Sequence, residues 1–585
     1  MNPALAGAAV AAVCLATVLL GTVGMRLSRT TSDFYVASRS VGPWWNASAI
    51  SGEYLSAASF LGIAGLILAY GVDMLWYPVG YAAGYLVLLL FVAAPMRRSG
   101  AYTLPDFAEE RLGSLPVRRI CTVLVITICW LYLLPQLQGA GLVLQTVTGA
   151  PPWVGTVVVA AVVLGNVAAG GMRSVTFVQA FQYWFKLTAL LAPLVLILLL
   201  WGGGPATGGT TDLSGAEYPT TREQVSLTVA QDVTVDAPQA ATVQVAGTLD
   251  EAAVDGEVML EAGRHTFGAG TELTLPAGTV VPQRVGAATV DNWSWLRPLH
   301  GASSGDYPLY ATYSLILATF LGTMGLPHVI VRFYTNPDGR AARRTTVGVL
   351  GLVGLFYLLP TAYGVLARQF APDLLVTGRT DTAVLLVPER VLGGTLGQAL
   401  AALITAGAFA AFLSTSSGLV VSVAGVLGQD VLGRLPAVRG FRLATVAAVA
   451  VPCTLSILAV RLPVADAVGL AFAVAASSFC PLLLLGIWWR GLTVAGAATG
   501  LLVGGGAATL AVLITIVDPD HRGWLGAALQ QPAAWAVPLA FVTMVTVSLA
   551  TRRSVPAGTA RALARMHTPE RLTARRAGTD RSSHR

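Results

Sequence analysis

Four hydroxyl-bearing residues in a row, at positions 414–417, interrupt an otherwise apolar stretch over residues 397–429. Polar side chains are costly in hydrocarbon, so a cluster of them there indicates a functional site. On a helix, Ala411, Ser414 and Thr415 share one face and present one backbone carbonyl and two hydroxyls. Such hard oxygen ligands suit a monovalent cation. The alternative is that the hydroxyls bond to the preceding turn or join neighbouring helices.

A second polar interruption lies at residues 45–62, a stretch long enough to cross a bilayer. Gly52, Glu53 and several serines fall at its middle, where they predict a break in the helix. A break frees backbone carbonyls for a cation and exposes the N-terminus of a half-helix to an anion. Glu53 is an acid within the membrane. It pairs with a cation, carries a proton or lines a vestibule, and the sequence leaves these three roles open.

A third interruption, at residues 321–333, combines two glycines and a proline with a histidine and an arginine. Gly322, Gly325 and Pro327 predict a second broken helix. His328 is either a packed, hydrogen-bonded residue or part of a gate. Arg332 lies near the predicted cytoplasmic end, and we interpret it as a gate or interface residue rather than a substrate clamp.

These polar sites need elements that hold them in a membrane. The chain has 585 residues, 55% of them hydrophobic and 11% charged, whereas a soluble domain carries about 25% charged residues. Thirteen stretches reach the roughly 20 apolar residues that a bilayer span needs. We therefore predict an all-α polytopic membrane protein with about thirteen transmembrane helices. They begin near Pro3, Trp44, Met74, Arg119, Trp153, Gln179, Tyr307, Thr345, Leu392, Arg442, Pro463, Gly491 and Pro532.

The arginines predict the orientation of these spans, because cytoplasmic loops carry an excess of basic residues. The net charge of +7 is therefore assigned to topology rather than to nucleic-acid binding. No basic residue precedes Arg26, so we interpret the first span as retained rather than as a signal peptide. We predict a multi-pass protein of the cell membrane, with the N-terminus outside and the C-terminus cytoplasmic. With that orientation one face holds the arginines of residues 26–39, 97–119, 173, 340–344, 434–442, 490 and the tail.

A polar region between residues 204 and 306 carries thirteen acidic residues and four arginines. Short alternating runs such as residues 225–229 and 242–245, separated by Gly, Pro and Asp, predict β-strands. We predict a small β-rich extracytoplasmic insert. It is either a lid or partner-binding module, whose partner is unknown, or a solvated addition of one lineage. The basic tail at 553–585 is rich in Arg, Ala and Thr and is predicted to be disordered.

The two broken spans occupy corresponding positions in two sets of five spans. Paired broken helices of this kind indicate the binding site of an inverted-repeat transporter. The two sets enter the membrane from opposite sides, as inversion requires. The predicted division is residues 1–203 for spans one to six (first repeat within 44–203), 204–306 for the insert, 307–490 for spans seven to eleven (second repeat), 491–552 for spans twelve and thirteen, and 553–585 for the tail.

Six segments carry a family resemblance: residues 33–39, 52–63, 170–172, 325–328, 332–337 and 411–418. Together they make the chain resemble the sodium:solute symporter family, and most closely its cation/acetate (monocarboxylate) symporter branch. The resemblance covers almost the whole chain apart from the insert and the tail. It implies a LeuT-type core of ten helices in a 5+5 inverted repeat. It also implies a sodium site between the first and eighth helices of that core.

The resemblance also implies particular site residues. The sodium ligands would be the carbonyls of Gly52, Leu55 and Ala411 and the hydroxyls of Ser414 and Thr415. Substrate would lie beside the broken helices, near Tyr54, Ser56, Ser59, Gly322 and Gly325. Gating or proton-linked roles would fall to Glu53, His328 and Arg332. Tyr54 aligns where sugar and proline members carry Asn or Asp, so the pocket of those members is not reproduced.

The function implied is a secondary active transporter, not an enzyme, that couples inward sodium or proton movement to uptake of acetate, propionate or pyruvate. The expected partners are a small carboxylate, a sodium ion and the lipid bilayer, with no nucleic acid. No cofactor and no catalytic residue is expected, and sodium is the only metal. The alternatives are a sodium symporter for another solute such as proline, and a transporter-like membrane sensor. The coupling ion, the exact acid and the oligomeric state stay open.

Overall fold

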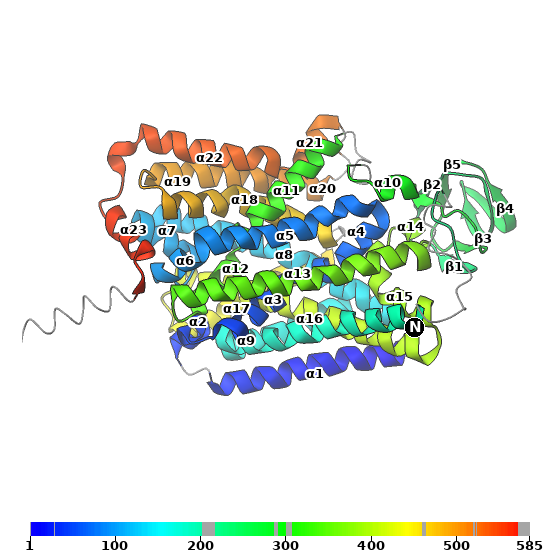
Figure 1. Ribbon diagram of the computed structural model, residues 1–585, viewed down its shortest axis with the longest axis horizontal. Coiled ribbons are helices and arrows are strands. Elements are labelled where there is room, and N and C mark those ends of the chain that lie inside the picture. Colours follow the sequence, from blue (N-terminus) through cyan, green and yellow to red (C-terminus); the bar gives the residue numbers. More distant parts are fainter. Residues whose placement is uncertain are drawn as a thin grey trace, which may run out of the picture.

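The computed structural model describes residues 2–27, 30–201, 217–285, 291–299, 307–458, 464–518, 521 and 523–570. Figure 1 shows a bundle of long helices that lie side by side, with a small sheet at one end. Within the described residues, eleven segments are long and apolar enough to cross a membrane. The predictions of a helical membrane protein and of a small β-rich region are confirmed.

The helices before the sheet include three long ones, α1, α8 and α9, and a series of short helices and helical turns. They are α1 (Pro3–Leu27), α2 (Thr31–Val36), η1 (Ala37–Arg39), α3 (Pro43–Tyr54), η2 (Ala58–Gly62), α4 (Ile63–Tyr70), η3 (Gly71–Leu75), α5 (Trp76–Val87), η4 (Leu88–Val92), α6 (Ala93–Ser99), α7 (Leu104–Leu112), α8 (Leu115–Thr148) and α9 (Pro152–Trp201).

The helices after the sheet are likewise a mixture of long helices and short helical turns. They are α11 (Pro308–Gly325), α12 (Pro327–Val331), η6 (Arg332–Thr335), α13 (Gly339–Phe370), α14 (Leu374–Thr377), η7 (Thr380–Thr382), α15 (Ala383–Leu392), α16 (Gly394–Val426), η8 (Leu427–Val431), α17 (Ala437–Leu458), α18 (Val464–Trp488), α19 (Val494–Gly500), η9 (Leu501–Gly506), α20 (Ala507–Val517), α21 (Gly523–Gln530), α22 (Ala533–Ala550), η10 (Arg552–Ser554) and α23 (Thr559–His567).

The eleven segments are fewer than the thirteen predicted spans because Pro152–Leu200 contains two of those spans, and Ala58–Ser99 joins the end of the second predicted span to the third. Ala58–Ser99 has 42 residues and Pro152–Leu200 has 49, about twice the length of one crossing. Glycines in positive φ interrupt the helical backbone in both, Gly71 (φ 77°) in the first and Gly171 (φ 57°) in the second. A Cβ at Gly171 would also lie 2.6 Å from the Cα of Phe34, so both the backbone conformation and the close approach require glycine.

Seven antiparallel strands form the sheet, in the order β1-β6-β3-β5-β2-β7 with β4 paired to β3. Asp250 and Glu251 join β3 to β4 with φ of 48° and 67°, the positive values that a two-residue hairpin turn of type I′ requires. The strands are β1 (Val225–Thr228), β2 (Val233–Ala237), β3 (Ala241–Leu249), β4 (Ala252–Leu260), β5 (Gly263–Phe267), β6 (Glu272–Leu275) and β7 (Gln283–Arg284).

The short helix α10 (Asn292–Trp295) attaches this insert to the bundle. The buried Trp295 indole donates a 2.6 Å hydrogen bond to the carbonyl of Ile67 on α4. Arg368 of α13 lies over the indole at 5.5 Å and donates to the Leu68 carbonyl at 3.1 Å. Since α4 continues from the predicted broken helix, the insert is bonded directly to the element that carries the predicted site.

His265 and Asp250 give the sheet a pH-dependent contact, 2.8 Å long. Burial lowers the pKa of His265, but hydrogen bonds to Asp250 and to the Glu261 carbonyl outweigh it, and the pKa rises above 6.5. Burial raises the pKa of Asp250, but hydrogen bonds from His265 and the Thr266 amide bring it below 3.8. The contact is therefore complete between pH 3.8 and 6.5. It is lost as the pH rises through the folded-state pKa of His265 or falls through that of Asp250.

We expect proteolysis of the β3–β4 turn to be slowest within that pH window and to accelerate on the alkaline side. The measurement is limited proteolysis of the whole protein across a pH series. The cleavage rates are corrected for the pH dependence of the protease itself. His265→Gln should remove the alkaline change. An unchanged alkaline profile in that variant would contradict this assignment.

The first part of the C-terminal tail is helical. The basic helix α23 packs on α6 and α7, at the end of the bundle opposite the sheet (Figure 1). Arg565 pairs with Glu110 at 3.1 Å, and Arg111 donates to the Thr559 hydroxyl at 2.9 Å. Leu563 and Met566 are buried. The prediction of disorder is therefore wrong for residues 559–570, because apolar burial and ion pairs fix them, and residues 571–585 lie outside the described residues.

Candidate functional site

The first broken helix is confirmed at the predicted place. Helix α3 ends at Tyr54, Leu55 leaves helical geometry (φ −74°, ψ 83°), and the chain resumes as a π-helical turn at Ala58. The amide of Ala57, at the start of the second half, donates to the Gln136 side chain of α8 at 3.2 Å. The break leaves the carbonyls of Gly52 and Leu55 outside the regular helical pattern, where side chains of other helices reach them.

The second broken helix is α11, which stops at Gly325. Leu326 is extended (φ −70°, ψ 119°), and Pro327 starts the short helix α12. A Cβ at Gly322 would lie 2.5 Å from the Phe472 carbonyl, and one at Gly325 would lie 2.3 Å from the Ala475 carbonyl. Both predicted substrate-binding glycines thus lie against the backbone of α18, where they allow α11 to pack closely.

Helix α16 lies against the first break, as the hydroxyl run predicted. The Ser414 hydroxyl is 2.7 Å from the Gly52 carbonyl and 3.1 Å from the Ala411 carbonyl. The Thr415 hydroxyl donates to the Glu53 carbonyl at 2.6 Å. The structure therefore brings together the five residues that were predicted as cation ligands. The Thr415 hydroxyl, however, is already hydrogen-bonded to the Glu53 carbonyl.

A residue that the sequence reasoning missed occupies the middle of this group. The Lys186 ammonium of α9 donates to the Gly52 carbonyl at 2.5 Å, to the Leu55 carbonyl at 2.7 Å and to the Ser414 hydroxyl at 3.0 Å. Lys186 is fully buried. Its signal was present in the sequence, because it is the one lysine of the chain and it lies in an apolar span.

A buried ion pair lies next to the cation group. The Arg332 guanidinium donates to the Glu53 carboxylate at 2.5 Å, and both side chains are 1% exposed. Arg332 also donates to Thr176 at 2.8 Å and to the Gln179 side chain, whose amide in turn donates to the Ser414 carbonyl at 2.7 Å. The sequence singled out Glu53 and Arg332 separately, and the structure pairs them directly, with Thr176 and Gln179 of α9 as further partners of Arg332.

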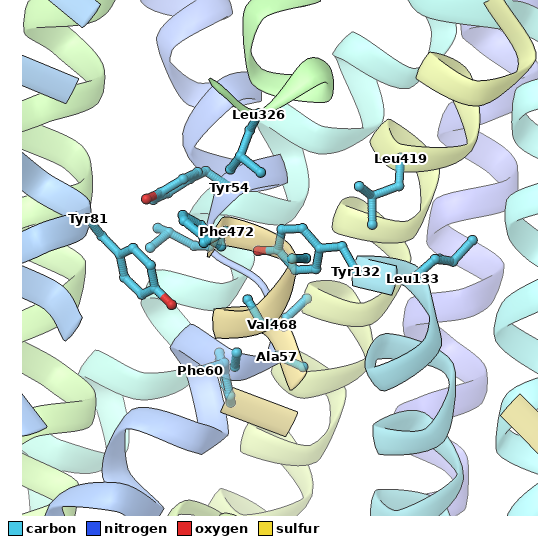
Figure 2. Packing of buried hydrophobic residues seen from close by; sticks show 14 of the residues in the cluster. Tyr54, Ala57, Phe60, Tyr81, Tyr132, Leu133, Leu326, Leu419, Val468 and Phe472 are labelled. Carbon is cyan, nitrogen blue, oxygen red and sulfur yellow. The ribbon is translucent and has the colours of Figure 1, made fainter. Parts of the chain in front are cut away.

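An aromatic cluster fills the space between the two breaks. Figure 2 shows Tyr54, Tyr81, Tyr132 and Phe472 with their rings grouped between α3, α5, α8 and α18. Ring centroids are 4.9 Å apart for Tyr81 and Phe472, and 5.9 Å apart for Tyr132 and Phe472. Among them, sequence reasoning named Tyr54 alone, since an aromatic residue in a membrane span gives no signal that separates a site from packing.

The polar atoms of this cluster are partly unpaired. The Tyr54 hydroxyl bonds to Thr323 of α11 at 2.7 Å, and Ser59 bonds to the Tyr357 hydroxyl at 3.0 Å. Among the described residues, neither ring nitrogen of buried His328 has a hydrogen-bond partner, and neither does the Tyr85 hydroxyl. Buried polar atoms without partners are costly, so they indicate a place where a polar ligand completes the bonding. Ser56 is buried at the break itself.

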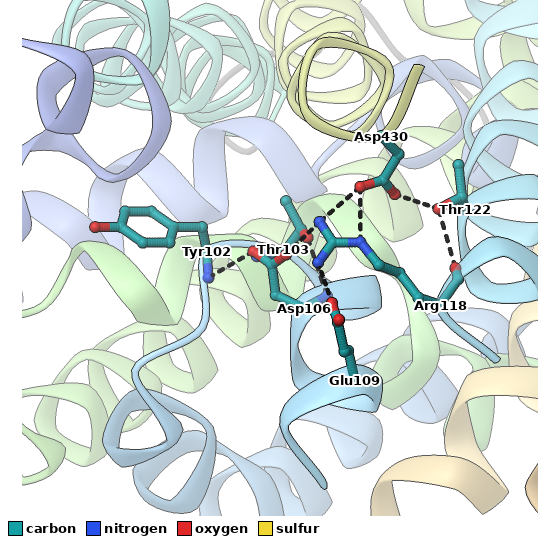
Figure 3. Close-up of polar contacts among 7 residues, drawn as sticks. All are labelled: Tyr102, Thr103, Asp106, Glu109, Arg118, Thr122 and Asp430. Carbon is teal, nitrogen blue, oxygen red and sulfur yellow. Dashed lines mark hydrogen bonds and ion pairs between the residues drawn. The ribbon is translucent and has the colours of Figure 1, made fainter. Parts of the chain in front are cut away.

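A charged cluster joins α7 and the start of α8 to η8, the turn that follows α16 (Figure 3). Arg118 pairs with Asp430 of η8 at 2.6 Å, with Asp106 of α7 at 2.8 Å and with Glu109. Thr122 donates a further hydrogen bond to Asp430. The cluster therefore connects η8, which follows the helix of the cation group, to α7 and to the start of α8.

Asp430→Asn should lower stability by about 1 kcal/mol, because Arg118 loses one charged acceptor but keeps two others. The change in apparent Tm of the purified protein measures it. Glu109→Gln is the matched control at the more exposed partner, and its effect should be smaller. An equal or larger effect of the control would contradict the assignment.

Two broken helices that meet at buried polar groups inside a membrane bundle define a solute transporter. The chain belongs to the sodium:solute symporter family, whose model matches residues 34–213 and 288–504. A monocarboxylic acid transporter of Corynebacterium glutamicum is 30% identical over 552 residues, covering 89% of this chain and 87% of that protein. The uncharacterised symporter YwcA of Bacillus subtilis is 28% identical and covers 90% of both chains.

The fold is shared with a solved transporter. A Na⁺-coupled sialic acid symporter in a substrate-bound outward-open state matches with a TM-score of 0.61 and 15% identity, covering 93% of this chain and 98% of that chain. The prediction of a LeuT-type core is confirmed. The family and these relatives are transporters, and the protein is a multi-pass membrane transporter.

Proposed function

We propose that the protein takes up a short-chain monocarboxylate, such as acetate, propionate or pyruvate, across the cell membrane with the inward movement of sodium or a proton. The observation that carries this proposal is the relation, along nearly the whole chain, to a monocarboxylic acid transporter. The N-terminus would lie outside and the C-terminus in the cytoplasm, as the arginine distribution predicts.

The chemistry of the aromatic cluster supports a small acid. The Tyr85 hydroxyl and the His328 ring are buried without hydrogen-bond partners among the described residues, and a carboxylate accepts hydrogen bonds from such donors. Phe472, together with Leu326 and Val468 in the same cluster (Figure 2), offers apolar surface for a short alkyl chain. Tyr54 lies at the end of one half-helix, and Thr323, its partner, lies near the end of the other. A solute between the two breaks would therefore contact both repeats.

Transport would follow from relative movement of the two breaks. Ser414 and Thr415 connect α16 to the α3 carbonyls, while Tyr54 connects α3 to α11. A conformational state in which solute bridges these helices is favoured by the solute's differential affinity for that state. Small rearrangements at the breaks would then open the site to one side or the other.

Uptake of radiolabelled acetate into sealed proteoliposomes tests the proposal. Imposed sodium and proton gradients are varied separately, and unlabelled propionate, pyruvate, lactate and proline compete. We expect accumulation that requires a cation gradient and competition by the monocarboxylates but not by proline. Absence of acid uptake, or stronger competition by proline, would overturn the proposed substrate class.

A further inference from the structure

The residues of the predicted sodium site do not fit a bound sodium ion, because a side chain of the protein already fills the site. The three donors of the Lys186 ammonium meet two backbone carbonyls and one hydroxyl at 2.5–3.0 Å. An ammonium group has three N–H donors and no acceptor, so its hydrogen bonding is complete there. These acceptors belong to Gly52, Leu55 and Ser414, three of the five predicted cation ligands.

We infer that the Lys186 ammonium is the resident cation of this site, that it replaces sodium as the bridge between α3 and α16, and that solute transport by this protein does not require sodium. Lys186 donates to both α3 and α16 from α9, so it joins three helices through one charge. This contact supplies the link between the first broken helix and α16 that a bound ion would otherwise make.

Electrostatics opposes a second cation in the same place. A sodium ion held by the same oxygens would lie only a few ångströms from the Lys186 ammonium. At such a separation, like-charge repulsion weakens binding on the order of a thousandfold, even with the screening typical of protein sites. The charged groups that face this site are Glu53 on α3 and Arg332 in η6, which pair with each other. Helix α16 carries no ionisable side chain.

The residue type is also informative. The 36 basic residues of the chain include 35 arginines, and the one lysine is at this position. A guanidinium is a planar fork suited to carboxylates, whereas an ammonium is a compact point charge with three donors. Only the compact group matches three oxygens arranged around one point. Of the two coupling ions in the proposed function, the proton is then the one that drives uptake.

Sodium binding to the purified protein tests the inference without any transported solute. We expect the apparent Tm of the wild type to be the same in sodium chloride and in choline chloride at equal ionic strength. Lys186→Ala frees the oxygens of the site, and sodium should raise the Tm of this variant, because a ligand that binds only the folded state stabilises it. Leu191→Ala, at an exposed position of the same helix, is the matched control and should stay insensitive to sodium.

Two further measurements keep the test decisive if Lys186→Ala does not fold. Binding of radioactive sodium to the wild type should be absent at millimolar sodium. In proteoliposomes with an inward proton gradient, replacing sodium by choline should change uptake less than about twofold, whereas coupling between two bound ligands spans about 5–150-fold. The uptake measurement alone rests on the proposed function. Saturable sodium binding to the wild type, or a Tm rise in the wild type equal to that of Lys186→Ala, would overturn the inference whatever the solute is.

Discussion

Glu53→Gln should abolish transport and destabilise the protein by about 3–5 kcal/mol, because it leaves the Arg332 guanidinium buried without its counter-charge. Both side chains are 1% exposed, so water does not replace the lost carboxylate. Glutamine keeps the size of the side chain, and the loss therefore reports charge rather than volume. Apparent Tm in detergent and uptake in proteoliposomes are the two measurements.

A paired substitution separates charge from packing. Glu53→Leu combined with Arg332→Met removes both members of the ion pair, and replacement of a buried pair by apolar residues is often neutral for stability. We expect this double variant to recover most of the lost stability while uptake stays absent. If Glu53→Gln alone had the wild-type Tm, the ion pair would not be the element that holds the first break in place.

Gly52→Ala should reduce uptake on the order of tenfold or more and cost about 1–3 kcal/mol by overpacking. A Cβ at this position would lie 2.2 Å from the Gln179 carbonyl and 3.3 Å from the Tyr183 Cβ, so α3 and α9 would have to separate. That separation would move the Gly52 carbonyl away from the Lys186 ammonium, which is held on α9.

Gly351→Ala is the matched control for this prediction. Gly351 lies within α13, and a Cβ there would meet no atom within 4 Å. Alanine is the better helix former, so this variant should be as stable as the wild type or more so. Similar losses in the two variants would show that the effect of Gly52→Ala is not specific to the contact between α3 and α9.

The elements of the site could be predicted because their signals are local. Glycine, proline and serine in the middle of an apolar stretch weaken a helix at that place, and both breaks occur there. The face shared by Ala411, Ser414 and Thr415 follows from helical periodicity alone. The sheet was readable from alternating residues and turn formers. None of these inferences needs knowledge of what packs against the element.

The connections between elements could not be predicted in this way. Glu53 and Arg332 are 279 positions apart, and nothing in either segment states that they pair. Lys186 and Ser414 belong to different helices whose mutual rotation is fixed only by packing. The helical start of the tail was missed because its order depends on the surface of α6 and α7, not on its own composition. The contact of Gly322 and Gly325 with the backbone of α18 was likewise not apparent from their own segment, and their part in substrate binding stays a prediction.

Because the chain has a single lysine, amine-reactive reagents have only one side chain that they can modify. With Lys186 fully buried and its three donors engaged, the folded transporter offers no side-chain amine for acylation or reductive methylation. Modification at this position would occur only when the helices around it separate. The rate of Lys186 acylation can be followed in one peptide by mass spectrometry. It would therefore report how often the site opens in an otherwise unlabelled, unmutated protein.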